Sequence, residues 1–262
     1  ELVNFNAAEG LVINPAFTWS KRLDTITYSR RSISISPSLR YGFANGHFNG
    51  HATFRYNYGK QYANNISLSG GKRVFQFNNN SPIGERGNTL SSLLSEENRI
   101  KSYEAVYLRS SYRISLGQGF LITAGFQYQD RRPLDNRTNY TWRDRADKEY
   151  TPNYPNEIVN ENISPHKVFY SLLGINWQPG ARYIELPDRK INIGSKYPVF
   201  SLQYIRSFDG FLGSDADFSK WRFSVSDNIN LKLRGLFRYR LGMGGFIDND
   251  KVQLPDYNHF NG

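Results

Sequence analysis

The sequence contains no cysteine and only one methionine, and it has no long apolar run. Without cysteine there is no disulfide framework, no thiolate nucleophile and no cysteine-ligated metal site. The longest apolar run, residues 119–126, falls far short of the roughly 18 apolar residues that a membrane-spanning helix needs. The mean hydropathy is also low, at −0.61. These absences argue against a helical membrane protein.

Sequence signatures of common catalytic and binding sites are missing as well. There is no nucleophile-elbow GxSxG, no HExxH, no GxGxxG ahead of a helix and no complete Walker A motif. His47 and His51 are four residues apart on a predicted strand, roughly 13 Å, which is too far for one metal ion. Asp215 and Asp217 offer oxygens for calcium but lack the EF-hand spacing. We therefore expect a protein without cofactor, metal or enzymatic activity, although a catalytic site built from loop residues at the extracellular rim stays open.

Aromatic residues, in contrast, are abundant. The 262 residues include 18 Tyr, 18 Phe and 4 Trp. A polar loop protein has no need of so many, whereas the walls of outer-membrane β-barrels use aromatic side chains as girdles at the two membrane interfaces.

The clearest pattern lies in residues 228–246, NINLKLRGLFRYRLGMGGF, where apolar and polar side chains alternate. Successive side chains of a strand point to opposite faces, so this segment predicts a strand with one apolar and one cationic face. It is longer than the 5 or 6 residues usual in soluble strands, and it exceeds the roughly 10 residues that a tilted strand needs to cross a bilayer. We interpret it as a wall strand of a barrel with lipid outside and water inside.

Similar alternation recurs along the chain and predicts about ten strands. The other nine are residues 9–20, 32–43, 47–58, 63–77, 103–116, 120–129, 168–177, 197–208 and 221–226. The pair Asn45-Gly46 predicts a tight hairpin, Gly70 and Gly71 predict a bulge or a close approach, and Asp227 and Asn228 are expected to form the turn before the last strand. The expected fold is an all-β antiparallel transmembrane β-barrel.

The phase of each strand assigns its residues to lipid or lumen. The predicted lipid-facing residues are Phe54, Tyr56, Ile114, Phe126, Leu231, Leu233, Phe237, Tyr239 and Leu241. The predicted lumen-facing basic residues are Arg40, Arg55, Arg113, Lys232, Arg234, Arg238 and Arg240. For the basic set, pairing with acidic residues of loops or a plug is the ordinary alternative to anion selection.

Two long connections interrupt the strands. Residues 130–165 are polar, charged and rich in proline, which is unusual inside a soluble domain but ordinary for an extracellular barrel loop. Residues 78–98 are expected to form a second loop that includes a short helix, since NTLSSLLSEEN starts on a plausible cap, Asn88, and contains Leu90, Leu93 and Leu94. Counting connections places both loops on the same, outer side.

The formal net charge of +10 raises the question of a nucleic-acid partner. The Lys and Arg residues recur on the polar phase of successive strands rather than in one domain or tail. We therefore expect no nucleic acid. The basic residues are expected to line the lumen or to face anionic headgroups, with outer-membrane lipid and lipopolysaccharide as the neighbours.

Eight stretches along the chain form a recognisable combination: NFNAAEG (4–10), GKRVFQFN (71–78), NTLSSLL (88–94), RRPLDN (131–136), YTPNYP (150–155), KYPVFSLQY (196–204), LGSDADFSK (212–220) and DYNHFNG (256–262). Together they resemble a large uncharacterised outer-membrane family of the Bacteroidota. Members of that family carry an N-terminal carboxypeptidase-regulatory-like domain before a barrel that is distantly Omp85-like in style. The resemblance implies that residues 1–262 are an incomplete barrel region, with a β-sandwich module upstream and closing strands downstream. It transfers no catalytic residue.

These observations favour a non-enzymatic protein of the bacterial outer membrane. We expect a scaffold or accessory subunit of a surface or outer-membrane biogenesis complex, with other outer-membrane or lipoprotein subunits as partners. The alternative is a pore or uptake barrel whose Arg-lined lumen passes anionic solutes. A soluble β-sandwich that packs its aromatic faces against each other is a third possibility.

Overall fold

The computed structural model describes residues 1–24, 31–59, 61–78, 82–143, 148–155, 161–186 and 189–259. Within these residues the fold is all-β and antiparallel, with one twelve-stranded sheet and a separate hairpin. The sheet contains β1 (Val3–Asn6), β2 (Gly10–Ile13), β3 (Trp19–Arg22), β4 (Ser32–Gly42), β5 (Phe48–Tyr58), β6 (Asn64–Gln76), β7 (Ser102–Gly117), β8 (Phe120–Pro133), β9 (His166–Trp177), β12 (Val199–Ser207), β13 (Asp217–Asn230) and β14 (Leu236–Lys251). The hairpin is β10 (Arg182–Leu186) with β11 (Arg189–Gly194).

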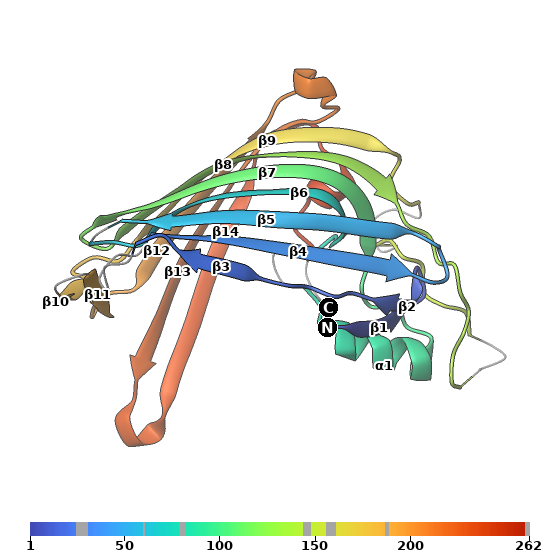
Figure 1. Cartoon of the computed structure of the whole chain (residues 1–262), viewed down its shortest axis with the longest axis horizontal. Coiled ribbons are helices and arrows are strands. Elements are labelled where there is room, and N and C mark those ends of the chain that lie inside the picture. The colour runs from blue at the N-terminus through green and yellow to red at the C-terminus, as the bar shows by residue number, and fades with distance from the viewer. Residues whose placement is uncertain are drawn as a thin grey trace.

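The large sheet curves into an arch with a convex and a concave face (Figure 1). Its strand order is β1-β2-β4-β5-β6-β7-β8-β9-β12-β13-β14, and β3 also pairs with β4. Within the described residues β14 pairs only with β13, so the sheet is open and no closed barrel is found. In the same part of the chain, no helix combines the length and apolarity that a membrane span needs.

Strand register carries the predicted two-faced pattern across the sheet. Residues that pair directly across neighbouring strands share a face. One such row runs Ala124, Leu173, Tyr204 and Trp221 on the convex side. A row of the opposite phase runs Thr53, Ser69, Arg109, Gln127 and Tyr170 on the concave side. The convex face is therefore mainly apolar and the concave face polar and basic.

Side-chain burial is concentrated at one end of the arch. Two small apolar clusters lie there: Phe77, Tyr103, Ala105 and Ile163 form one, and Val168, Ala216 and Phe218 form the other. Most large apolar side chains of the convex face stay exposed, such as Leu108 and Leu173. The described residues therefore form no single large core.

The same end carries helix α1 (Glu85–Ser95), which confirms the short helix predicted within residues 78–98. The expected cap was wrong, because the helix begins at Glu85 and Asn88 lies inside it. The helix lies below the arch (Figure 1). The second long connection contacts it, because the Trp142 backbone N–H donates to the Leu93 carbonyl at 2.9 Å and the Thr141 hydroxyl donates to the same oxygen at 2.8 Å. Both long connections therefore lie at one end of the sheet, as predicted.

The prediction of one strand over residues 9–20 is wrong. The chain forms β2 and β3 instead, with Pro15 between them. Proline has no N–H for the ladder, although its carbonyl accepts a hydrogen bond from the Leu39 backbone N–H at 3.0 Å. The β10–β11 hairpin was also missed, because residues 178–196 look like a polar connector.

The continuous strand predicted over residues 228–246 is also wrong. β13 continues through Asp227 and Asn228, where a turn was expected, and the chain reverses after Asn230. The turn is a short 3₁₀ helix, Lys232–Arg234, closed by the Leu231 N–H donating to the Gly235 carbonyl at 2.8 Å. Gly235 adopts a φ of 101°, which favours glycine. Four residues assigned to a membrane wall, Leu231, Lys232, Leu233 and Arg234, therefore lie at a hairpin tip.

Candidate functional site: a basic cavity on the concave face

Apart from the four residues at the hairpin tip, the residues predicted to face lipid and those predicted to face the lumen lie on opposite faces of the sheet, as their alternation along each strand requires. By strand register the convex face carries Phe54, Tyr56, Ile114, Phe126, Phe237, Tyr239 and Leu241. The concave face carries Arg40, Arg55, Arg113, Arg238 and Arg240. Register thus supports the division into two sets for these residues, but their contact with lipid or with a lumen stays a prediction.

Arg40 pairs with acidic residues, which is the ordinary alternative to anion selection for a basic residue of this face. Its partners, Glu9 and Glu85, lie outside its own strand. Its Nη2 lies 2.5 Å from Glu9 Oε2, and its Nε donates to Glu9 Oε1 at 2.8 Å. Its Nη1 also donates to Glu85 Oε1 of helix α1 at 3.2 Å. Arg40 therefore ties β4 to the β1–β2 hairpin and to the helix, and it has a structural role.

A cavity of about 630 Å³ lies on the concave face. Strands β5 to β9, β12 and β13 form its walls, and Pro255, Asp256 and Tyr257, which follow β14, form part of its lining. Its cationic lining residues are Arg55, Arg73, Arg109, Arg131 and Lys220, and Asp256 is the one carboxylate among its lining residues. Of these five residues, only Arg55 is among the basic residues predicted to face the lumen. The others lie on the polar phase of their strands, which is the signal that could have found them.

Arg131 and Asp256 form a buried ion pair at one side of this cavity. Their side chains are 3% and 4% exposed. Two parallel hydrogen bonds run from Arg131 to the Asp256 carboxylate at 2.9 and 2.8 Å, and Arg131 Nε donates to Gln129 Oε1 at 2.7 Å. Lys220 Nζ donates to the Asp256 backbone carbonyl at 2.5 Å. These contacts anchor the short 3₁₀ helix Leu254–Asp256 against β8 and β13.

Arg55, Arg73 and Arg109 differ from this pair, because they are exposed and form no salt bridge within the described part of the chain. The Arg73 guanidinium lies 5.3 Å from the centre of the Phe75 ring. Their paired neighbours on the same face are small hydroxyl side chains, with Ser67 beside Arg55 and Ser69 beside Arg109. The cavity thus offers three guanidinium groups to solvent.

Three of the four residues considered as metal ligands, His47, Asp215 and Asp217, contact protein partners. His47 Nδ1 lies 3.2 Å from Glu104. The Asp215 carboxylate accepts from the Lys167 backbone N–H at 2.8 Å, and Asp217 lies 2.8 Å from Arg206. Across the described ranges, no group of three or more His, Cys, Asp or Glu side chains is arranged to hold a metal ion.

The fold defines an all-β protein built on one large, open, two-faced antiparallel sheet with a basic concave side. The chain belongs to a family of unknown function (DUF5686), because the model of that family's C-terminal domain matches residues 1–262. No curated protein matches the chain.

Proposed function

We propose that this sheet is the membrane-embedded part of an outer-membrane β-barrel that works as a non-enzymatic scaffold or accessory subunit of a surface or biogenesis complex. The observation that carries the proposal is the partition of side chains between two faces of one sheet. The apolar side chains of the convex face are exposed, whereas the concave face is polar. A soluble protein rarely exposes so large an apolar surface.

The extent of the apolar surface supports this proposal. On β7 the convex positions run from Val106 to Leu116, with Leu108, Tyr112 and Ile114 between them. At roughly 3.3 Å per residue these eleven residues extend about 36 Å. At the tilt of about 45° usual for membrane strands, they cover about 25 Å, the height of the apolar band of an outer-membrane barrel.

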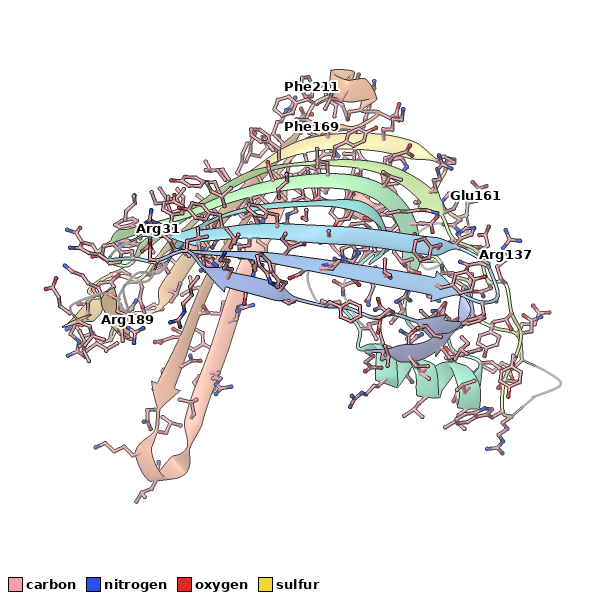
Figure 2. The ribbon with its side chains drawn as sticks, viewed as in Figure 1. Arg31, Arg137, Glu161, Phe169, Arg189 and Phe211 are labelled. Atoms are coloured by element: carbon pink, nitrogen blue, oxygen red, sulfur yellow. The ribbon has the colours of Figure 1, made fainter. Side chains whose placement is uncertain are left out.

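Aromatic side chains gather at both ends of that face, as membrane girdles would. At the end with short turns, Phe120 stacks on Trp177 with ring centroids 5.4 Å apart, and Phe200 follows at 6.0 Å. At the end that carries α1, Phe169 lies 4.6 Å from Phe211 between ring centroids. Both of these residues project from the convex side (Figure 2).

Several charged residues of the convex face lie near the end that carries α1, beyond the apolar part, whereas Lys21 and Asp227 lie toward the opposite end. Lys72 pairs with Glu104 at 2.8 Å, and Arg206 pairs with Asp248 at 2.7 Å. Lys72 and Arg206 are close to the ends of β6 and β12, and Glu104 is close to the start of β7. Ion pairs at this level would meet headgroups rather than acyl chains.

The scaffold part of the proposal is supported by the long connection after β8. Tyr140 and Trp142 are 59% and 63% exposed in it, and aromatic residues are enriched in protein–protein interfaces. The described part of this connection is tied to the sheet, since the Asn153 amide donates to the carbonyls of Ser102 and Leu134 at 3.0 and 2.9 Å. A second outer-membrane or lipoprotein subunit would bind this presented surface.

Membrane insertion is tested with an arginine at the centre of the convex face. Leu173→Arg should lower insertion into phospholipid vesicles, because a charge at mid-bilayer on the lipid face costs about 2–4 kcal/mol. Leu233→Arg is the matched control, since Leu233 lies at the hairpin tip and is 105% exposed. Equal insertion of both variants, or a chain that stays monomeric and soluble without detergent, would contradict the proposal.

The scaffold role is tested in cells of the source organism. Crosslinking followed by detergent extraction should recover the protein with a partner, and a Tyr140→Ala, Trp142→Ala variant should lose that partner while it still inserts. A protein that migrates alone on size exclusion after crosslinking is the result that argues against a scaffold.

An anion pore is the second candidate, and the basic concave residues Arg55, Arg109, Arg113, Arg238 and Arg240 favour it. Planar-bilayer conductance separates the two functions, because a plugged scaffold gives none. In a pore, Arg238→Glu with Arg240→Glu should reverse the anion preference. Arg234, at the tip, should have no effect on it.

A further inference from the structure

We propose that the concave cavity is a binding site for an oxyanion ligand with two or more phosphate or carboxylate groups, held by Arg55, Arg73 and Arg109. The proposal goes beyond the membrane scaffold and does not depend on lipid contact by the convex face. A chain that fails to insert can still bind the anion, so the two proposals can fail separately.

The charge of the cavity lining favours an anionic ligand. Five cationic side chains line the cavity with a single carboxylate, that of Asp256, and Arg131 already neutralises it. A concave surface with one sign of charge and low-dielectric walls concentrates counter-ions. A multivalent anion bound between Arg55, Arg73 and Arg109 would interact favourably with all three charges.

The exposed cations are arginines, and arginine favours ligands with phosphate or carboxylate groups. A guanidinium presents a planar fork of donors that matches a carboxylate or a phosphate with two parallel hydrogen bonds. Arg131 already makes that kind of contact with Asp256 within the same cavity. The three exposed guanidinium groups have the same capacity and no carboxylate partner within the described residues.

The spacing of the three arginines favours a ligand with more than one charged group. Ser67 pairs with both Arg55 and Ser111, and Ser69 pairs with Arg109. Arg55 and Arg109 are therefore two strands apart along the sheet, and their Cα atoms are roughly 12 Å apart, while Arg73 is roughly 14 Å from Arg109. By the same register the Cα atoms of Arg55 and Arg73 are roughly 20 Å apart. Long side chains at this spacing suit a ligand with separated charges better than a single small ion. The hydroxyl groups of Ser67, Ser69 and Thr53 and the Gln127 amide supply neutral donors between them.

The size of the cavity agrees with such a ligand. At about 630 Å³ it falls within the range of small-molecule sites. Phe75, Phe77, Tyr103 and Tyr107 line one part of it and would accept an apolar portion. The charged groups could belong to a soluble metabolite or to a lipid headgroup, and the recognition chemistry is the same for both.

The test is equilibrium binding to the purified 262-residue chain in detergent. Soluble arms use radiolabelled pyrophosphate and citrate, and a lipid arm uses mixed micelles with cardiolipin, whose headgroup carries two phosphates. In at least one arm, Arg73→Gln and Arg109→Gln should each weaken binding by about tenfold, the amount expected for loss of one charge-assisted contact. Arg109→Lys, which keeps the charge but not the fork, should weaken it less.

Arg113→Gln is the matched control, because Arg113 lies on the same face but does not line the cavity. Binding that depends on Arg73 and Arg109 supports the site, and the arm in which it occurs identifies the source of the anion. Absence of binding in all three arms overturns the proposal. So does an equal loss in the Arg113→Gln control, which would mean general attraction to positive charge. Tryptophan fluorescence confirms that each variant is folded.

Discussion

At the residue scale, the buried pair of Arg131 and Asp256 should be the most sensitive contact in the chain. Asp256→Ala leaves an unpaired guanidinium in a buried position, which costs about 3–5 kcal/mol. Guanidinium-induced unfolding followed by tryptophan fluorescence should show this loss, and limited proteolysis should cut after β14. The double variant Arg131→Met, Asp256→Leu should recover most of the stability. A loss below about 1 kcal/mol for the single variant would mean that the segment is not anchored there.

Gly71 lies at a position where the backbone conformation and the neighbouring strand leave no room for a side chain. Its φ is +130°, and a Cβ there would lie 2.3 Å from the Gly50 carbonyl oxygen of β5. Gly71→Ala should therefore destabilise the sheet by at least about 1–3 kcal/mol in denaturant unfolding. Gly245→Ala, on β14 with open space around it, should change stability by less than about 1 kcal/mol. Similar unfolding midpoints for both variants would contradict this account.

At the element scale, the connection after β8 is attached to α1 through Tyr150. The Tyr150 hydroxyl lies 2.7 Å from the carbonyl oxygens of Ser92 and of Tyr140. Burial, together with the negative charge of Glu96, raises the pKa of Tyr150 to about 12, compared with about 10 in an unfolded chain. The folded state therefore holds this proton more tightly. The stabilisation from Tyr150 is complete below about pH 10 and is lost as the pH rises towards about 12.

This pH dependence can be measured against Tyr150→Phe. Between about pH 10 and 12 the free energy of unfolding of the parent should fall more steeply than that of the variant, because the variant lacks the titrating hydroxyl. If the free energy of unfolding of the two proteins changed in parallel with pH, Tyr150 would have the same pKa in the folded and unfolded states.

Element prediction from the sequence succeeded where alternation and turn chemistry agreed. The hairpin at Asn45-Gly46 is present, with Gly46 at a φ of +67°, and Gly71 does mark a close approach. Prediction failed at residues 231–235, since Leu231, Leu233 and their basic neighbours continue the alternation through a turn. An alternating pattern shows which side of an extended chain is apolar. It does not reveal that the chain reverses direction when the residues before and after the turn keep the same alternation.

The cavity was less predictable than the fold. Arg55 was identified, but the pairing of Arg131 with Asp256, 125 residues later in the chain, depends on how the segment after β14 returns across the concave face. No local pattern encodes that return. The sequence therefore indicated a basic face, while tertiary packing determines which of its charges are neutralised and which are available.

At the scale of the whole molecule, the sheet has an unusual free edge. Among the described residues β14 pairs along one side only, so its sixteen residues expose unpaired backbone groups. Such long edges associate with other strands. The 262-residue chain by itself is therefore expected to associate edge to edge through β14.

The absence of cysteine makes this association simple to test. Two copies that pair antiparallel through β14 bring the middle of that strand close to its own symmetry mate, so Met243→Cys should give disulfide-linked dimers in detergent under mild oxidation. Leu173→Cys is the control, because Leu173 is also exposed on the convex face but lies on β9, which has paired strands on both sides. Dimers from Met243→Cys alone identify β14 as the associating edge. Equal crosslinking of the two variants would mean random collision, and no crosslinking of either would mean that the edge is protected.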